Sequence, residues 1–251
     1  MGMKKKYLLA SLLAILAAGI YLYYFHARIY QEISKANLKS PDKNQTFLIG
    51  ADMDFQKNIV YAALGDSLTA GVGVLNYEES FPYLIAGKMA QDGKKVTLKD
   101  HSIPGAKVGD LKDKLVSAAI ADNPDIITIL AGVNDVHGKV SLAEFKNSYG
   151  AILKRLTEET DAKIYLVSIP FIGAPSLMMP PYNLYIDWQT KKFNSVIKAL
   201  AETYKAQYID LYSPTAAQFK TNGAHYSPDL FHPSAEGYAI WAKIIYGYFD
   251  K

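Results

Sequence analysis

The sequence predicts an α/β domain, in which a parallel sheet carries helices on both sides, preceded by a helix that crosses a membrane. Two observations favour the α/β domain. Five short apolar runs alternate with segments of helical periodicity after residue 58, and the run 125–131 is rich in β-branched residues, which is typical of a strand buried on both faces. A third observation, a long uncharged apolar stretch near the N-terminus, predicts the membrane helix.

The composition fits one α/β domain with an N-terminal appendage, since the chain has 251 residues of which 50% are hydrophobic. Its 27 basic and 24 acidic residues are nearly balanced, which argues against a nucleic-acid-binding surface. The chain has no cysteine, which excludes disulfides, a thiolate nucleophile, a cysteine-rich zinc site and a lipid attached to cysteine.

The apolar stretch at residues 7–27 covers roughly 30 Å at about 1.5 Å per residue, the thickness of the hydrocarbon core of a bilayer. Lysines at positions 4–6 precede it and basic residues are sparser beyond it, so the positive-inside rule places the domain outside the cytoplasm. Residues 1–28 are therefore a membrane anchor or a signal sequence. We favour an uncleaved anchor because Tyr21, Tyr23 and Tyr24 suit an interfacial belt. The small residues at 16–19 leave secretion after signal cleavage as the alternative.

Residues 29–58 are predicted to form a linker between the membrane and the folded domain, residues 59–251. The centre of this segment, residues 39–45, is polar and carries a proline, as is typical of a linker. Apolar side chains that could pack against the domain follow it: Phe47, Leu48, Ile49, Met53 and Phe55.

Strands and helices then alternate along the chain. Asp92 and Gly93 end the first helix, Ser141 and Glu144 have the spacing of a capping box, and Ser234 is placed to cap the last helix. The predicted strands are 59–64, 96–101, 125–131, 163–169 and 207–211, and the predicted helices are 80–91, 108–121, 141–159, 185–204 and 234–249.

Polar motifs follow several of these strands. Gly65, Asp66 and Ser67 mark an abrupt turn after the first strand, where ligands of open α/β sheets gather. Asp229 and His232 stand three positions apart, so that a carboxylate can orient an imidazole. A serine hydroxyl becomes an effective nucleophile only beside such an oriented base.

Four blocks of sequence, in this order and at these separations, resemble the GDSL or SGNH family of serine hydrolases over residues 59–249. The blocks are Gly65-Asp66-Ser67, Ser102-Ile103-Pro104-Gly105, Gly132-Val133-Asn134-Asp135 and Asp229-Leu230-Phe231-His232-Pro233. The resemblance implies a three-layer α/β/α, flavodoxin-like fold with a five-stranded parallel sheet in the order 2-1-3-4-5. It also implies a serine esterase that works through an acyl-enzyme and needs no cofactor or metal.

The same resemblance assigns the site residues. Ser67 would be the nucleophile, His232 the proton carrier and Asp229 its orienting partner, which together make a catalytic triad. The oxyanion hole would comprise the backbone N–H groups of Ser67 and Gly105 and the side-chain amide of Asn134. One departure from the family pattern is Pro104, which removes a backbone donor beside this hole but leaves the Gly105 N–H in place.

Two further aspartates, Asp66 and Asp135, are interpreted as supports for loop geometry. His101 and His137 follow predicted strand ends and are interpreted as structural or solvated side chains.

The substrate is predicted to be a carboxylic ester, and lipid or lysophospholipid acyl esters are favoured. The stretch 65–84, with Ser80-Phe81-Pro82, resembles the bacterial lysophospholipase and thioesterase branch of the family. An O-acetyl esterase acting on cell-envelope polysaccharide is the main alternative, and an inactive surface binding module is a third hypothesis. The apolar connection 170–188 is either an acyl-binding wall or a cover over the core.

Overall fold

A six-stranded mixed sheet is the centre of the protein in the computed structural model, which describes residues 3–41, 46–50 and 57–249. The strands lie in the order β1-β3-β2-β4-β5-β6, and all neighbours are parallel except β1, which is antiparallel to β3. Their bounds are β1 Thr46–Ile49, β2 Lys57–Gly65, β3 Lys94–Ser102, β4 Ile126–Leu130, β5 Lys163–Val167 and β6 Gln207–Ile209.

The five predicted strands are confirmed as β2 to β6, in the order expected from the family resemblance. The prediction of a five-stranded, wholly parallel sheet was wrong at one edge, where β1 adds a sixth strand. Four residues are too few to show a clear alternation in the sequence. A tertiary contact instead favours this strand, because the ring of Phe47 stacks on Tyr77 with centroids 4.8 Å apart.

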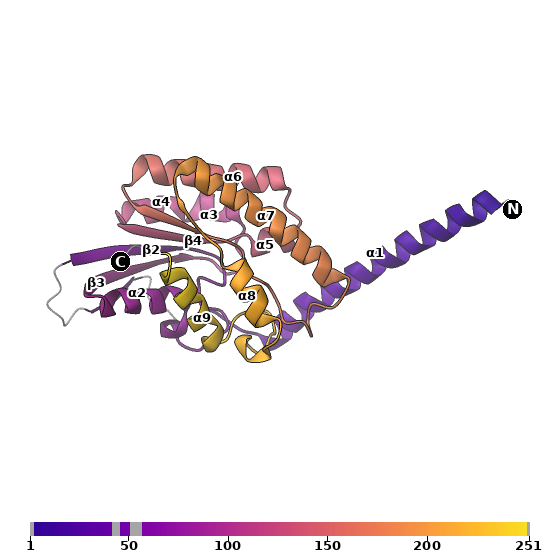
Figure 1. Ribbon diagram of the computed structural model, residues 1–251, viewed down its shortest axis with the longest axis horizontal. Coiled ribbons are helices and arrows are strands. Elements are labelled where there is room, and N and C mark those ends of the chain that lie inside the picture. Colours follow the sequence, from indigo (N-terminus) through magenta and orange to yellow (C-terminus); the bar gives the residue numbers. More distant parts are fainter. Residues whose placement is uncertain (1–2, 42–45, 51–56, 250–251) are drawn as a thin grey trace.

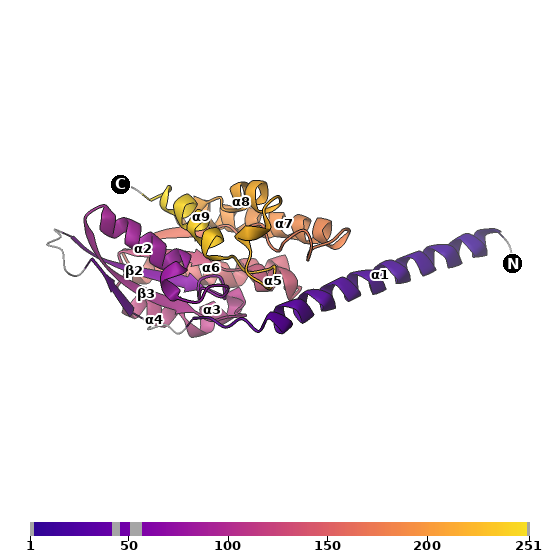
Figure 2. The same cartoon turned by 90° about the horizontal axis from the view of Figure 1, so that it is seen from below.

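Helices cover both faces of the sheet and complete the three-layer fold (Figures 1 and 2). Helices α2 and α9 pack together on one face, with α8 on the same side, and α3, α4, α6 and α7 cover the other face. The bounds are α2 Phe81–Gln91, α3 Val108–Lys114, α4 Val116–Ala121, α5 Val133–His137, α6 Leu142–Glu159, α7 Tyr182–Tyr204, α8 Tyr212–Phe219 and α9 Ala235–Tyr246. Short 3-10 helices are η1 Tyr77–Glu79 and η2 Gly223–His225.

The helix predicted at 108–121 is kinked at Leu115, which divides it into α3 and α4. The backbone bonds from Leu115 N–H to Leu111 O and from Ala119 N–H to Leu115 O persist across the kink. Helix α7 begins at Tyr182, three positions before its predicted start, so part of the predicted connection 170–188 is helical. The caps predicted at Ser141 and Ser234 each accept a backbone N–H.

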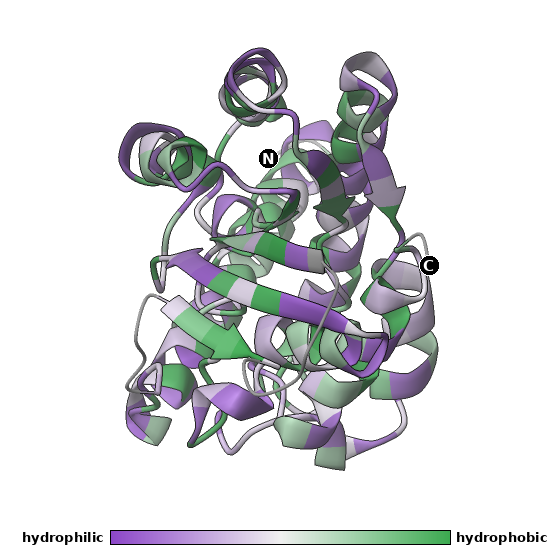
Figure 3. Ribbon diagram, turned by 90° about the vertical axis from the view of Figure 1, so that its left-hand side faces the viewer, coloured by the Kyte–Doolittle hydropathy of each residue, from purple (hydrophilic) through white to green (hydrophobic). Residues whose placement is uncertain are grey.

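The core lies between the sheet and the two helical layers. Strands β2, β4 and β5 are apolar on both faces, as parallel strands covered by helices must be. Figure 3 looks along the molecule from the end opposite α1 and shows helices turning their hydrophobic residues toward the sheet. Fully buried members of the core include Leu64, Ile127, Ile129, Leu166 and Phe81.

Helix α1, Met3–Ala36, extends well beyond the predicted membrane segment (Figure 1). Its first half projects away from the domain (Figure 1), and the helix as a whole is long and apolar enough to cross a membrane. Its second half packs on the domain, where Phe25 and Ile29 are buried and the Tyr21 hydroxyl donates to Pro180 O at 2.8 Å. One helix thus joins the apolar segment to the domain.

The described part of the segment 29–58, for which a linker is predicted, is largely in regular secondary structure. Residues 29–36 continue α1, and Phe47 and Ile49 of β1 pack against the core. Met53 and Phe55, also named as packing candidates, lie outside the described residues.

Candidate active site

Ser67 lies just beyond the carboxyl end of β2, and its position depends on Gly65. A Cβ atom at Gly65 would lie 2.5 Å from the carbonyl oxygen of Leu130 on β4 and would overlap the side chain of Thr69. Only glycine therefore permits this close approach of the turn to the neighbouring strand. The turn is tied to the loop after β3 by a bond from Ile103 N–H to Gly65 O at 3.1 Å.

A hydrogen-bond chain links Ser67, His232 and Asp229, which are far apart in the sequence. The Ser67 Oγ lies 2.9 Å from His232 Nε2, and His232 Nδ1 lies 2.6 Å from Asp229 Oδ2. With the imidazole proton on Nδ1, the ring donates to Asp229 and its Nε2 is free to accept from the Ser67 hydroxyl. This is the arrangement that a serine nucleophile needs.

A tight loop before α9 holds Asp229 and His232 together. Ser227 N–H donates to His232 O at 2.8 Å, and Leu230 N–H donates back to Ser227 O at 2.9 Å. Leu230 accordingly adopts a positive φ of 59°. The two site residues therefore meet across a closed loop rather than along a helical turn.

The carboxylate of Asp229 is buried and densely hydrogen-bonded. Its Oδ1 accepts three hydrogen bonds of 2.8–2.9 Å, from the hydroxyl of Ser227 and the backbone N–H groups of Phe231 and His232. Burial opposes its ionisation, but the hydrogen bond and charge of His232 and the two backbone donors outweigh that effect and lower the pKa of Asp229. Asp229 is thus a carboxylate at neutral pH.

The three candidate oxyanion donors belong to residues that line one cavity together with the Ser67 side chain. Gly105 has a positive φ of 79°, and within the described chain the backbone N–H groups of Ser67 and Gly105 donate to no protein acceptor. The side-chain amide of Asn134 donates to Ala106 O at 3.0 Å and to Asp66 Oδ2 at 3.3 Å. Asn134 would therefore have to give up one of these bonds to reach a substrate.

Asp66 and Asp135 brace the loops around these donors. Asp66 accepts from Leu68 N–H at 3.0 Å, and Asp135 accepts from Val108 N–H at 3.1 Å, at the start of α3. Burial raises the pKa of Asp66 to about 7 and that of Asp135 to about 6. Neither carboxylate contacts Ser67 or His232 through a hydrogen bond in the described residues.

A cavity of about 350 Å³ surrounds Ser67, and much of its wall is apolar. Four of its lining residues come from the N-terminal segment, which none of the sequence motifs places at this site. The lining comprises Ile29, Tyr30, Ile33, Leu38, Ser67, Val72, Pro104, Gly105, Asn134, His137, Phe231 and His232. The four-residue spacing of Phe25, Ile29 and Ile33 is the sequence signal that could have indicated a face of α1 packed on the domain.

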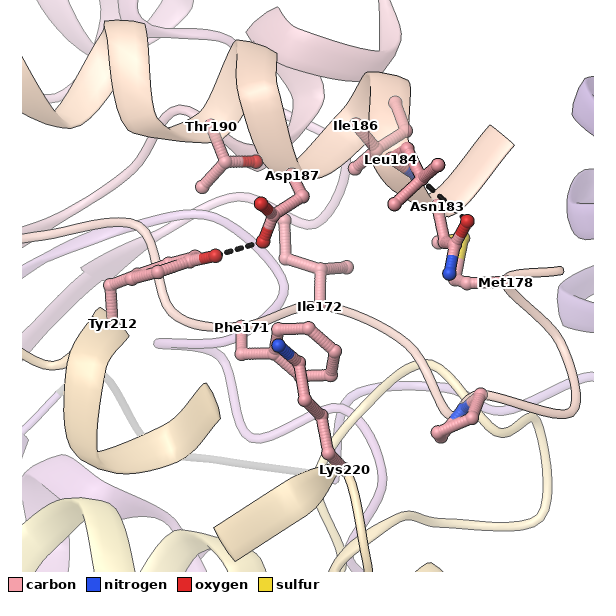
Figure 4. A pocket seen from close by; sticks show the side chains of 11 residues that line it. Phe171, Ile172, Met178, Asn183, Leu184, Ile186, Asp187, Thr190, Tyr212 and Lys220 are labelled. Atoms are coloured by element: carbon pink, nitrogen blue, oxygen red, sulfur yellow. Dashed lines mark hydrogen bonds between the residues drawn. The ribbon is translucent and has the colours of Figure 1, made fainter. Parts of the chain in front are cut away.

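The apolar connection 170–181 lines a different pocket, of about 340 Å³, between itself, α7 and α8 (Figure 4). Phe171 and Ile172 form its floor, and the hydroxyl of Tyr212 donates to Asp187 at its side. None of the residues that line the Ser67 cavity comes from this connection. The connection therefore does not form an acyl-binding wall at the Ser67 cavity, where α1 supplies apolar side chains instead.

His101 lies within β3 and His137 at the end of α5, and of these two histidines only His137 borders the Ser67 cavity. Its Nδ1 lies 3.3 Å from the hydroxyl of Tyr182, and burial lowers the pKa of His137 to about 4, so the ring is neutral. His101 instead pairs with Asp122, with Nε2 and Oδ2 2.7 Å apart.

Comparisons with known proteins agree with this fold. Residues 63–240 match the GDSL-like lipase/acylhydrolase family. The chain is 29% identical over 205 residues to the spore germination lipase LipC of Bacillus licheniformis, covering 73% of this chain and 92% of that one. It is 27% identical over 163 residues to an acetylxylan esterase of Geobacillus stearothermophilus, covering 59% and 69%. The crystal structure of a lipase/acylhydrolase from Enterococcus faecalis superposes with a TM-score of 0.63 at 20% identity, covering 75% and 94%.

Proposed function

This chain belongs to the GDSL-like lipase/acylhydrolase family and hydrolyses ester bonds, and on that premise we propose that Ser67, His232 and Asp229 catalyse the reaction. The observation that supports this assignment is the hydrogen-bond chain from the Ser67 hydroxyl through His232 to the Asp229 carboxylate. No cofactor is needed for such a mechanism.

In the first half of the reaction, His232 Nε2 takes the proton of Ser67 while Oγ attacks the ester carbonyl carbon. The resulting tetrahedral intermediate expels the alcohol, which receives the proton from His232, and leaves an acyl group on Ser67. In the second half, His232 takes a proton from water as the water oxygen attacks the acyl group. The carboxylic acid then departs and the proton returns to Ser67. Asp229 stabilises the imidazolium in both halves.

The oxyanion formed in each half would accept hydrogen bonds from the N–H groups of Ser67 and Gly105 and from the amide of Asn134. The two backbone donors are unengaged in the described chain and border the same cavity as the nucleophile. Donors fixed where charge develops each contribute about 3 kcal/mol to the stabilisation of such a transition state.

The favoured substrate is a lipid or lysophospholipid acyl ester. This is supported by the apolar side chains of Ile29, Ile33 and Phe231 around Ser67, which suit an acyl chain better than a sugar. Removal of O-acetyl groups from cell-envelope polysaccharide is the second candidate, which the similarity to an acetylxylan esterase supports.

Residues 1–28 are proposed to remain as a membrane anchor, with the catalytic domain, residues 59–251, on the extracytoplasmic side. The uninterrupted course of α1 from the apolar half into the half packed on the domain supports an anchor over secretion after cleavage. The full-length chain should therefore be recovered in the membrane fraction of cells. Recovery of a shortened soluble chain would contradict the anchor.

The test of the catalytic assignment is hydrolysis of a chromogenic ester series from acetyl to palmitoyl by the Ser67→Ala variant. The expected result is a loss of kcat on the order of 10⁴-fold or more for every ester, with unchanged circular dichroism. Ser117→Ala on the exposed surface of α4 is the matched control and should retain full activity. Undiminished turnover by Ser67→Ala would remove this serine from the mechanism. A preference of the wild type for acetyl esters would favour the polysaccharide substrate.

A further inference from the structure

A second cavity, of about 310 Å³, lies between α1 and α7 and adjoins the Ser67 cavity. The ring of His137 borders both cavities. The second cavity is lined by Gly19, Leu22, Tyr23, His26, Val136, His137, Lys139, Tyr182, Tyr185 and Ile186. Lys139 is the only lysine in this lining, which contains no arginine, aspartate or glutamate. Most of the other lining residues are apolar or aromatic.

We propose that this second cavity holds the acyl chain of a membrane lipid whose ester group lies at Ser67. The inference rests on the proposed function, and it names the substrate class and the part of the chain that selects it. It assigns α1 a role in substrate binding as well as in anchoring.

The length of the two cavities along α1 matches a lipid acyl chain. Ile29 lines the Ser67 cavity, and Gly19 is the residue nearest the N-terminus of α1 that lines the second cavity. Ten residues of helix separate them, which is about 15 Å at about 1.5 Å per residue. One leaflet of a hydrocarbon core of about 30 Å is also about 15 Å deep.

The far end of the second cavity lies at membrane level. About 20 apolar residues are needed to cross the hydrocarbon core, so a span that begins after the lysines at 4–6 ends near His26. Gly19 and Leu22, on the cavity rim, fall within the part of this span nearest the domain. A chain that leaves the cavity at this end therefore enters the outer leaflet directly.

The start of α7 and the connection before it support the same position of the membrane. The Tyr21 hydroxyl bonds Pro180 O at 2.8 Å, which fixes this region beside α1, as Figure 1 shows. Large apolar side chains are exposed here, with Met179 at 41%, Leu184 at 66% and Trp188 at 52%. Exposed apolar and aromatic residues next to a membrane helix are typical of a surface that dips into the lipid interface.

Hydrogen bonds join the three helices that form the wall between the two cavities. The hydroxyl of Tyr182 lies 3.1 Å from His26 Nδ1 and 3.3 Å from His137 Nδ1, so α1, α7 and α5 are joined by one hydrogen-bonded chain. The Nε2 of His137 is buried and has no hydrogen-bond partner among the described residues, so this pairing covers the Tyr182 hydroxyl and the two Nδ1 atoms only.

The test is to fill the second cavity with Gly19→Trp. A Cβ atom at Gly19 meets no other atom within 4 Å, so the backbone accepts the larger residue and its ring occupies the space proposed for the acyl chain. Ala17→Trp is the matched control, because residue 17 is exposed and points about 160° away around the helix. Full-length variants are assayed in phosphatidylcholine vesicles with palmitoyl and acetyl esters.

Gly19→Trp should lower the ratio of kcat/KM for palmitoyl ester to that for acetyl ester by about tenfold or more. Each methylene kept out of an apolar site weakens binding by about fourfold. Ala17→Trp should leave this ratio at the wild-type value. An unchanged ratio in Gly19→Trp, or an equal fall in Ala17→Trp, overturns the inference.

The same assay separates this inference from the proposed function. If the wild type hydrolyses acetyl ester through Ser67 but the ratio is insensitive to Gly19→Trp, the second cavity is not an acyl site and the catalytic assignment stands. If no ester is hydrolysed in a Ser67-dependent manner, both proposals are wrong.

Discussion

Replacement of Asp229 by asparagine should invert the tautomer of His232 while leaving the loop intact. The Oδ1 of Asp229 accepts from the Ser227 hydroxyl and from the N–H groups of Phe231 and His232. In Asp229→Asn the amide oxygen would keep these three donors, because an amide NH₂ there would face only other donors. The NH₂ group must then lie opposite His232 Nδ1, where the carboxylate oxygen lies at 2.6 Å.

The consequence is a change of proton position on the ring. An NH₂ donor at that site forces Nδ1 to accept, so the imidazole proton moves to Nε2 and points at Ser67 Oγ. The base can then no longer take the proton of the serine. A tautomer inversion of this kind in a serine protease lowers kcat by about 10⁴-fold, and we expect a loss of about 10³- to 10⁴-fold here.

The assay is kcat for a soluble acetyl ester, with circular dichroism to verify folding. Ser227→Ala is the matched control, since it removes one donor to Oδ1 but leaves the bond between Asp229 Oδ2 and His232 Nδ1 in place. The control should lose less than about tenfold, because the bond that sets the tautomer of His232 and the two backbone bonds to Oδ1 remain. A loss of less than about tenfold in a folded Asp229→Asn variant would refute the tautomer argument.

Two further predictions concern stability. In Gly65→Ala the new methyl group would lie 2.5 Å from Leu130 O and would overlap Thr69. The free energy of unfolding should therefore fall by about 1–3 kcal/mol, which thermal unfolding can measure. An unchanged midpoint of thermal unfolding would contradict the packing argument. Burial raises the pKa of Asp135 from 3.8 to about 6, so the folded state binds this proton more tightly than the unfolded state does. The stability that the protonated group contributes is therefore fully present below about pH 4 and is lost as the pH rises through about 6. Across that pH window the free energy of unfolding of the wild type should fall by up to about 3 kcal/mol relative to that of Asp135→Asn. If the two proteins show parallel plots of unfolding free energy against pH, the pKa of Asp135 is not raised in the folded state.

The position of α1 relates anchoring to substrate choice. A simple tether would leave the domain free to turn, but Phe25 and Ile29 are buried in the domain and Tyr21 and His26 hydrogen-bond to it. If α1 is a membrane anchor as proposed, these contacts would hold the Ser67 cavity at one height and one orientation relative to the bilayer. That arrangement would favour substrates that are themselves in or on the membrane.

The sequence by itself determined the order of strands and helices and the identity of the polar motifs. Period-2 and period-3.6 patterns are local, and they place β2 to β6 and the long helices without any knowledge of their neighbours. The motifs containing Ser67, Gly105 and Asn134 each follow a parallel strand, and the carboxyl ends of such strands meet at one edge of the sheet. This placement agrees with the assignment of the three residues to one site, which the family resemblance implies.

Tertiary structure alone decided the surroundings of that site. Strand β1 is too short to carry a pattern, and it exists because β3 offers a free edge and Tyr77 a ring for Phe47 to stack on. The wall beside Ser67 comes from Ile29 and Ile33 on α1 rather than from the apolar connection after β5. Local periodicity can indicate that a helix has a buried face, but it does not say which cavity or element that face packs against, because this depends on contacts between residues far apart in sequence.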